Sequence, residues 1–564
     1  MKFNINIKET MKRIIIVLFC AFCLGSCSAK AQQKNPNSSR IDKEYKTAMT
    51  KYNSMLEYIK YYYMDTVNIN KISETILKDL MEQLDPHSVY ISADEVAKMN
   101  EPLEAEFDGI GVQFAIIKDT LTVQNPVAGG PSEKVGIRAG DKIIGVDGEQ
   151  ISGKELTNDK VFKLLRGEKG TKVDLQIWRV PFGRAYKDGE KLDFTVVRDK
   201  IPIKSLAASY QAEPGVAYIK LSRFAATTYE EMMNALENLD ANKGIIIDLR
   251  GNGGGYLGQA MSISNEFLEK DELMLYTTGK NARPMNIKSD GKGHYKKTPL
   301  VLLVDGNSAS ASEIVSGAIQ DWDRGIIVGR KTFGKGLVQQ QFPLGDGSMI
   351  RLTVARYHTP SGRVIQRPYE NGNASDYYAD FIKRYMDGET FHRDSIHFPD
   401  SLKYTTLRTK RTVYGGGGIM PDVFVPQDTT ANSMYYSNLL RKGIIPEFVN
   451  RYVDKYRTTW KKEYTSFSQF QSNFKISDDF FNGLIDYATK QGVKKVPADI
   501  AKSKEDLKLY MKALTAGLVL QDADFYKVMN SGRDKEFKKA IEVINNWNEY
   551  SSKMLDTQSV VGTL

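Results

Sequence analysis

Cysteine is nearly absent from this chain. Its three cysteines, Cys20, Cys23 and Cys27, all lie near the N-terminus, so the rest of the sequence has no cysteine with which to form a disulfide. Histidine is also scarce, with five in 564 residues, and none lies in a Gly-x-Ser-x-Gly setting. The net charge of +9 includes no block of like charges, which argues against a nucleic-acid partner. A disulfide-stabilised body and the usual serine–histidine motif are therefore both disfavoured.

Long apolar runs are lacking as well. The run from Ile14 to Phe22 is far shorter than the ~20 residues that span a bilayer, and it follows Lys12 and Arg13. A charged segment followed by a short apolar one predicts an export signal over residues 1–26, with Met11 as an alternative start. An exported protein without internal disulfides is typical of a bacterial envelope.

Two cleavage sites compete after this signal. The sequence Leu24-Gly25-Ser26-Cys27 resembles a bacterial lipobox, which makes Cys27 the lipidated first residue. Ordinary signal peptidase instead cleaves after Ala31 and releases a soluble periplasmic protein that begins at Gln32. We favour the lipid anchor because Cys27 has no other evident role.

The length of 564 residues is too great for one core, so we expect several domains. With 41% hydrophobic and 26% charged residues, the composition predicts a folded protein rather than a disordered one. The expected segments are a signal peptide (1–26), a tether (27–40), an N-terminal helical region (41–100), a small β-rich domain (101–200), an α/β core (201–366), an insertion (367–411), a return to the core (412–430) and a C-terminal helical domain (431–564).

The α/β core is predicted from continuous apolar runs that alternate with helical patterns. Such runs occur at Val216–Leu221, Ile245–Leu249, Leu300–Val304 and Ile326–Val328. Unbroken apolar strands separated by helices are typical of a sheet that is covered on both faces.

The β-rich domain resembles a PDZ domain. A Gly109-Ile110-Gly111-Val112 loop precedes an alternating strand, and a short amphipathic helix follows from Thr157 to Arg166. In this arrangement, the N–H groups of Ile110, Gly111 and Val112 hold the carboxylate of a peptide that adds a strand to the sheet edge.

The chemistry of the chain is predicted from Ser310 and Lys335, which are 25 residues apart. Ser310-Ala311-Ser312-Glu313 is a capping box, which places a serine beside the free N–H groups of a helix N-terminus. Those N–H groups can stabilise the oxyanion that forms when a hydroxyl attacks a carbonyl. Ser308 and Ser312 are rival nucleophiles, and the local pattern does not choose among the three.

The loop Gly251-Asn252-Gly253-Gly254-Gly255 supplies a second group of accessible N–H donors directly after a buried strand. The pattern argues against a phosphate-binding loop, because no Gly-Lys-Ser/Thr sequence follows. Together with Ser310, we interpret this loop as the other half of an oxyanion hole, formed by the N–H groups of Gly251 and Ala311.

Lys335 becomes a base only if its pKa falls from ~10.4 to near neutrality, which costs roughly 4 kcal/mol. Gly334 and Gly336 allow the backbone to approach closely on both sides. Gln339 lies four residues further on, and on a helical turn its amide reaches the lysine amine. In an extended strand the two residues are about 13 Å apart and cannot touch.

In this order, the motifs resemble those of the C-terminal processing (tail-specific) proteases, which are serine peptidases with a Ser-Lys-Gln active site. The resemblance covers residues from about 52 to 426. It rests on Leu84-Asp85-Pro86-His87-Ser88, the PDZ-like domain, Asp248-Leu249-Arg250-Gly251-Asn252-Gly253-Gly254-Gly255, Ser308-Ala309-Ser310-Ala311-Ser312-Glu313, Phe333-Gly334-Lys335-Gly336 with Gln339, and Tyr357-His358-Thr359-Pro360-Ser361-Gly362.

The resemblance implies that Ser310 is a nucleophile, Lys335 its general base and Gln339 the residue that orients the base. It also implies a multidomain α/β protein: a crotonase-like α/β protease core, an inserted PDZ domain (a small β-barrel with helices) and helical N-terminal and C-terminal regions. No metal and no cofactor are implied. The insertion at 367–411 and the helical C-terminus depart from the family pattern.

We therefore expect a serine endopeptidase on the periplasmic side of the envelope that cleaves near protein C-termini, with an apolar final residue in the PDZ domain. Its partners are protein or peptide substrates and, through a lipid anchor, the membrane; an oligomer or an adaptor stays open. Two alternatives remain. A non-catalytic PDZ scaffold is opposed by the intact Ser310, Lys335 and Gln339, and a crotonase-like acyl-CoA enzyme by export and the PDZ domain.

Overall fold

The computed structural model describes residues 36–117, 119–127, 129–151, 153, 156–180 and 189–555. The expected export signal, the competing cleavage sites and Cys27 lie outside these residues. Across the described ranges, no helix is both long and apolar enough to cross a membrane. The chain forms two compact units, residues 1–77 and 78–564, which are described separately.

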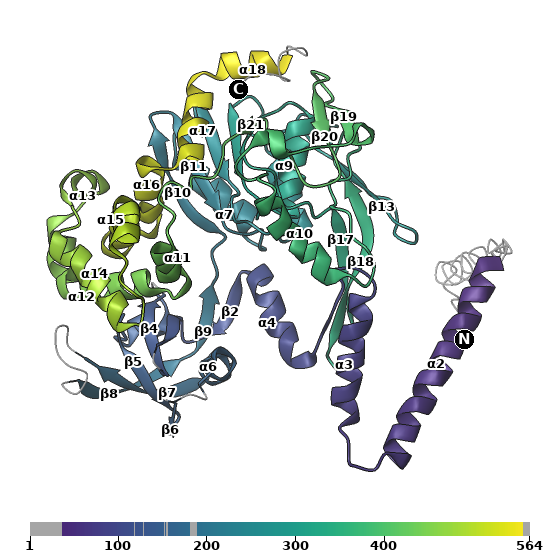
Figure 1. Cartoon of the computed structure of the whole chain (residues 1–564), viewed down its shortest axis with the longest axis horizontal. Helices are drawn as coiled ribbons and strands as arrows, with labels where there is room; N and C mark the ends of the chain where they lie inside the picture. The colour runs from purple at the N-terminus through teal and green to yellow at the C-terminus, as the bar shows by residue number, and fades with distance from the viewer. Residues whose placement is uncertain are drawn as a thin grey trace, which may run out of the picture. The chain divides into compact units, whose positions relative to one another are not determined.

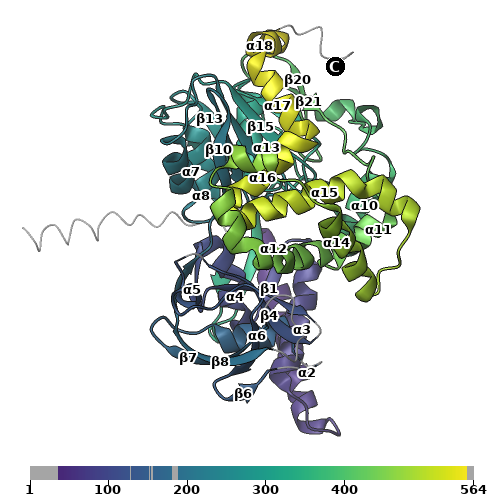
Figure 2. The same ribbon diagram turned by 90° about the vertical axis from the view of Figure 1, so that its left-hand side faces the viewer.

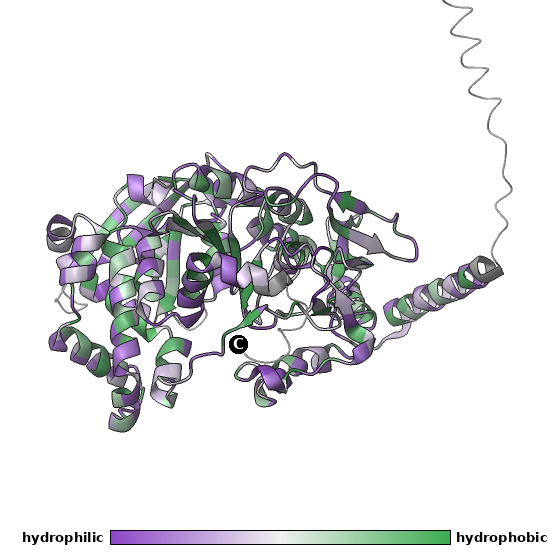
Figure 3. Cartoon of the chain, turned by 90° about the horizontal axis from the view of Figure 1, so that it is seen from above, coloured by the Kyte–Doolittle hydropathy of each residue, from purple (hydrophilic) through white to green (hydrophobic). Residues whose placement is uncertain are grey.

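The described part of the first unit is helical. It consists of α2 (Pro36–Tyr62) and the first part of α3 (Ile69–Glu82). Hydrophilic and hydrophobic residues are mixed along α2 (Figure 3). α2 begins at Pro36, within the segment 27–40 that is expected as a tether. Proline suits a helix start, since its fixed φ is already helical and its missing N–H has no partner in the first turn.

The larger unit is built around a six-stranded sheet (Figure 1). The strand order is β10 (Leu206–Glu213), β11 (Val216–Leu221), β12 (Gly244–Asp248), β15 (Leu300–Val304), β16 (Ile326–Gly329) and β21 (Val423–Phe424). β10 and β11 are antiparallel, and the remaining neighbours are parallel. Every residue of β12, β15 and β16 is buried, as the continuous apolar runs predict.

Helices cover both faces of this sheet. Alternate strand residues such as Leu302 pack against α7 (Thr228–Leu236), α8 (Leu257–Asn265) and α9 (Ala311–Asp321). The intervening residues, such as Leu303, pack against α17 (Lys535–Asn545) and its neighbours. α16 (Asp522–Gly532) and α18 (Trp547–Leu555) complete this second layer. The last three helices of the expected C-terminal domain are therefore part of the core (Figure 2).

The preceding helices have a hydrophobic core of their own. They are α11 (Met434–Arg441), α12 (Ile444–Glu463), α13 (Phe467–Asn473), α14 (Asp478–Lys490) and α15 (Pro497–Val519). α15 contacts α11, α12 and α16, and so connects this bundle to the helices on the sheet (Figure 2).

A second sheet carries part of the expected site. Its strands are β1 (Val89–Ile91), β18 (Met349–His358), β13 (Leu273–Thr278) and β14 (Asn286–Lys288), and β17 (Leu337–Pro343) also pairs with β18. The insertion at 367–411 contributes α10 (Ala374–Met386), the short turns η2 (Arg393–Ser395) and η3 (Asp400–Leu402), and β19 (Lys403–Thr405), which pairs with β20 (Thr412–Tyr414). Tyr377 of α10 is buried, with its ring edge on His87, so the insertion is more than a surface loop.

The PDZ-like domain has its own antiparallel sheet. Its strands are β3 (Val112–Ile117), β4 (Thr120–Pro126), β5 (Lys142–Val146), β7 (Lys172–Arg179) and β8 (Glu190–Val197), with β6 (Glu149–Gln150) on β5. Its helices are α5 (Pro131–Lys134) and α6 (Asn158–Leu165). β2 (Glu106–Gly109) pairs with β9 (Asp199–Pro202), so the domain enters and leaves the chain as one insertion after α4 (Ala93–Glu104). β3 is an edge strand, as the sequence predicts.

Candidate active site

Ser310 lies at the N-terminus of α9, and its backbone distinguishes it from its neighbours. It has φ 55° and ψ −112°, a strained conformation for a residue with a side chain. Ser310 is partly exposed. Ser308 and Ser312 are fully buried, and their hydroxyls donate to the carbonyls of Leu249 and Asn252, both at 2.8 Å. The structure therefore separates three serines that the local pattern leaves equivalent.

Glu313 connects Ser310 to the lysine loop. Its Oε2 accepts the N–H groups of Ser310 and Lys335, both at 2.9 Å. Its Oε1 accepts the N–H of Gly334 at 2.7 Å and the hydroxyl of Thr332 at 2.5 Å. The side chain is fully buried, and burial raises the pKa of Glu313 to about 7 although these hydrogen bonds favour the ionised form. The capping box predicts only the first of these four contacts.

Lys335 has the environment of a base. Burial, followed by the charge of Arg351, lowers the pKa of Lys335 to about 8, although the charges of Asp85 and Glu313 act in the opposite direction. A Cβ atom on Gly334 would lie 2.5 Å from Cγ of Arg367, so glycine is required for this close approach.

Tyr357 adds a second link beneath the site. Its hydroxyl donates to the carbonyls of Lys335, at 2.8 Å, and Ser310, at 3.3 Å. The tyrosine is buried and belongs to β18, so this strand positions the backbones of both residues.

Gln339 contacts Lys335, although the segment between them is neither a helical turn nor a fully extended strand. Lys335 Nζ donates to Gln339 Oε1 at 3.0 Å. Lys335 precedes β17, and the pairing of β17 with β18 shifts register between Val338 and Gln339, so the segment is neither helical nor fully extended. The Gln339 amide also donates to the carbonyl of His87, which fixes its orientation.

The turn at Asp85 positions the His87 carbonyl that binds the Gln339 amide, a contact that local patterns in the sequence do not indicate. Asp85 Oδ1 accepts the N–H groups of His87 at 2.8 Å and Ser88 at 2.9 Å. It also accepts the hydroxyl of Thr353 at 3.0 Å, which ties the turn to β18. The Asp-Pro-His-Ser spacing is typical of such an Asx turn, so the turn was visible in the sequence but its contact with Gln339 was not.

The glycine loop lies beside Ser310, but Gly251 does not have the expected role. The N–H of Gly251 donates to Asp305 Oδ1 at 2.9 Å and is therefore occupied. The approach to Ser310 occurs at Gly254, where a Cβ atom would lie 2.7 Å from Cβ of Ser310 and 2.9 Å from N of Ala311. Within the described ranges, the N–H groups of Ala311 and Gly253 have no hydrogen-bond partner. The available donors are thus Ala311, as expected, and Gly253.

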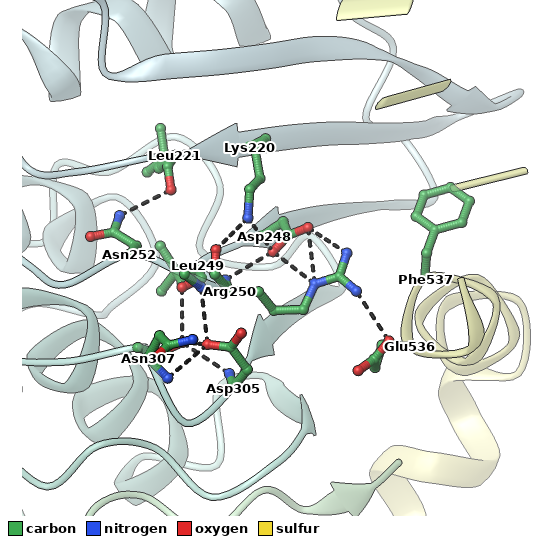
Figure 4. A network of polar contacts seen from close by, with 12 residues as sticks. Lys220, Leu221, Asp248, Leu249, Arg250, Asn252, Asp305, Asn307, Glu536 and Phe537 are labelled. Carbon is green, nitrogen blue, oxygen red and sulfur yellow. Dashed lines mark hydrogen bonds and ion pairs between the residues drawn. The ribbon is translucent and has the colours of Figure 1, made fainter. Parts of the chain in front are cut away.

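A network of charges anchors the start of the glycine loop (Figure 4). Arg250 Nη2 pairs with Asp248 at 2.6 Å and with Asp534 at 2.9 Å, and Nη1 pairs with Glu536 at 3.2 Å. Lys220 pairs with Asp248 at 2.9 Å. Burial alone would raise the pKa of Asp248, but the charges of Arg250 and Lys220 hold it well below its usual value.

Two of these carboxylates come from α17 and the residue before it. Asp534 and Glu536 meet Arg250, and Glu536 also pairs with Arg330 at the end of β16. Without Asp534 and Glu536, the positive charges of Lys220, Arg250 and Arg330 would be balanced by Asp248 alone. The C-terminal helices therefore complete the charge balance directly behind the glycine loop.

The peptide-binding residues expected in the PDZ-like domain form a separate site. Ile110 and Gly111 make the turn before β3, and Val112 is its first residue. The carbonyl of Ile110 accepts the N–H of Ser132 at 3.0 Å, which fixes the turn. In the part of the chain that the structure describes, the N–H of Gly111 has no hydrogen-bond partner. No cluster of three metal-binding side chains occurs among the described residues.

Comparisons with known families match three segments of the chain. Peptidase family S41 matches residues 215–377, a PDZ domain matches residues 109–197, and a family of unknown function matches residues 435–520.

Two curated proteins resemble most of the catalytic unit. A carboxy-terminal-processing protease of Bartonella bacilliformis is 34% identical over 362 residues, which cover 63% of this chain and 80% of that protein. The carboxy-terminal processing protease CtpA of Bacillus subtilis is 31% identical over 403 residues, which cover 68% of this chain and 82% of that protein. These matches confirm the resemblance inferred from the motifs.

Solved structures give matches of smaller extent. The photosystem II D1 C-terminal processing protease is 29% identical, with a TM-score of 0.33, over 56% of this chain and 83% of that one. The PDZ domain of a carboxy-terminal protease from Vibrio cholerae is 32% identical, with a TM-score of 0.15, over 17% of this chain and 97% of that domain.

The charge network predicts a large loss of stability for Glu536→Gln. The variant leaves buried Arg250 and Arg330 with one anion fewer, which should reduce the free energy of unfolding by on the order of 3 kcal/mol. Chemical denaturation measures this change. Lys535→Gln on the same helix is the control, because its pair with Asp428 is largely exposed and should contribute less than ~1 kcal/mol. Equal losses for the two variants would contradict the role given to the network.

Proposed function

Since the chain belongs to peptidase family S41 and is a carboxy-terminal processing serine protease, we propose that Ser310 is its nucleophile, Lys335 its general base and Gln339 the residue that orients the base. The observation that supports this proposal most is the Glu313 carboxylate, which binds the backbones of Ser310 and Lys335 together. The protease relatives favour a peptidase over both the PDZ scaffold and the acyl-CoA enzyme.

In the proposed reaction, the neutral amine of Lys335 takes the proton of the Ser310 hydroxyl as Oγ attacks the substrate carbonyl carbon. Collapse of the tetrahedral intermediate breaks the C–N bond, and the Lys335 ammonium gives its proton to the leaving amine. Water then attacks the acyl carbon while Lys335 takes its proton. Collapse of this second intermediate breaks the bond to Ser310 Oγ, and Lys335 returns the proton to that oxygen. A pKa of about 8 leaves roughly a tenth of the amines neutral at pH 7, which is enough for a base.

We assign the oxyanion hole to the N–H groups of Ala311 and Gly253, because the N–H of Gly254 donates to Asn252 Oδ1 at 2.9 Å. Both segments lie against Ser310, and the dipole of α9 adds partial positive charge at Ala311. This assignment replaces Gly251, whose N–H is bound to Asp305.

The PDZ domain is proposed to bind substrate C-termini through the N–H groups of Ile110, Gly111 and Val112. The free edge of β3 gives the peptide backbone a strand to pair with, and α6 lies on the same side through the contact of Phe162 with Phe114. An apolar final residue would pack on this surface.

We further propose an envelope location. A lipid on Cys27 would tether the enzyme to the membrane on the periplasmic side, whereas cleavage after Ala31 would release it into the periplasm. The sequence Leu24-Gly25-Ser26-Cys27 supports the lipid anchor.

Ser310→Ala should abolish peptidase activity without unfolding the protein, because the hydroxyl is needed for attack and not for packing. Ser312→Ala is the matched control: it loses one buried hydrogen bond, which costs ~1 kcal/mol, and should keep substantial activity. Turnover of a fluorogenic peptide measures both. Full activity of Ser310→Ala, or equal loss in the two variants, would refute the assignment of the nucleophile.

The peptidase rate should rise with pH through about 8. The lysine must be neutral to act, so kcat/KM increases as Lys335 loses its proton and is constant above this pKa. Lys335→Arg should be nearly inactive, because a guanidinium stays protonated. Lys331→Arg on the same loop is the control and should keep the parent profile. A normal rate for Lys335→Arg would show that the base lies elsewhere.

The PDZ assignment predicts that a peptide with a free C-terminal carboxylate binds more tightly than its amide, by ~1.5–3 kcal/mol. The measurement is calorimetric titration of the full chain carrying Ser310→Ala, which prevents cleavage. A charged final residue should weaken binding if, as proposed, an apolar final residue packs on this surface. Equal affinities for acid and amide would mean that this domain does not bind C-termini.

A further inference from the structure

One face of the β17–β18 hairpin extends from the catalytic lysine toward the PDZ domain. Gln339 lies opposite Thr353, and two residues along, Gln341 lies opposite Arg351. Residues two apart on a strand share a face, so Arg351 is on the side that carries Gln339. Gln341 donates to Asn100 of α4 at 2.9 Å, and α4 leads directly into the PDZ domain. Arg351 therefore lies on the face that joins Gln339, the partner of Lys335, to the helix that leads into the PDZ domain.

Arg351 lacks the acidic partner that several buried arginines of the core have. Arg250, Arg363 and Arg411 each pair with an aspartate. Arg351 is half-buried, forms no ion pair with any residue that the structure describes, and has a buried Nη2 atom without a hydrogen-bond partner. Withdrawing a guanidinium from water without a partner is unfavourable, so this side chain is suited to receive an anion.

The charges around Arg351 place it at the site of the reaction. Its positive charge lowers the pKa of Lys335. Burial lowers the pKa of Arg351 itself, and the charge of Tyr256, the residue directly after the glycine loop, acts in the opposite direction. The guanidinium is thus close to both the base and the loop beside Ser310.

We propose that Arg351 is a carboxylate-binding subsite on the leaving-group side of the scissile bond. It takes either the terminal carboxylate of the substrate or an acidic side chain within the segment that is released. The planar guanidinium binds a carboxylate through two parallel hydrogen bonds. We place the subsite on the leaving-group side because the hairpin face leads toward the PDZ domain, which is proposed to bind the substrate C-terminus. This inference rests on the proposed function.

The test uses four fluorogenic peptides that differ only at one side chain and at the C-terminus. Two carry Glu and two carry Gln at one position after the cleavage site, and each version ends in a free acid or an amide. The parent enzyme should cleave the peptides that carry the preferred carboxylate with kcat/KM about five- to twentyfold higher than the others. In Arg351→Gln the ratio should fall to about one, and Arg351→Lys should give an intermediate ratio. Arg356→Gln is the control, because Arg356 is exposed on the same strand.

The outcomes show where the bound carboxylate comes from, and they distinguish failure of the subsite from failure of the proposed function. A preference for Glu that is lost in Arg351→Gln identifies a side-chain carboxylate, and a preference for the free acid that is lost in this variant identifies the terminus. A preference that Arg351→Gln leaves intact belongs to another part of the enzyme, such as the PDZ domain, and overturns the subsite. If Arg351→Gln slows all four peptides equally, the arginine acts only on Lys335 and the subsite is overturned. The same holds if the parent shows no preference. If the parent cleaves none of the peptides and no protein substrate, the proposed function fails instead.

Discussion

The buried carboxylate of Glu313 is the interaction on which the rest of the site depends. Its two oxygens accept the N–H groups of Ser310, Gly334 and Lys335 and the hydroxyl of Thr332. A fully buried carboxylate is costly unless its lone pairs are satisfied, and four donors satisfy them here. Because the donors come from two segments, the same bonds that stabilise Glu313 hold the backbone of Ser310, the proposed nucleophile, close to that of Lys335, the proposed base.

Around this carboxylate, each part of the site is held by a different layer of the fold. The parallel sheet supplies β12 and β15, whose ends carry the glycine loop and Ser310. β17 and β18 carry Gln339 and Tyr357. The helices after α15 cover the second face of the sheet and place Asp534 and Glu536 against Arg250. The position of the glycine loop and the packing of the C-terminal helices therefore depend on the same network of charges.

Local patterns in the sequence predicted much of this, and the failures have physical causes. The buried strands, the capping box at Ser310 and the two glycines around Lys335 are local features, so they could be recognised from neighbouring residues. The bond that occupies the N–H of Gly251 comes from Asp305, which is 54 residues away. The support of Gln339 by the turn at Asp85 spans about 250 residues. Such contacts follow from the tertiary fold, which no local periodicity contains.

The most direct test of the account is to trap the acyl-enzyme. A peptide ester that acylates faster than it deacylates should accumulate on the enzyme, and acid quenching during turnover should preserve the adduct. Mass spectrometry of the intact chain and of its tryptic peptides then locates the added acyl group. The account predicts one acyl group, attached to Ser310. An adduct on Ser308, on Ser312 or on any other residue would contradict it.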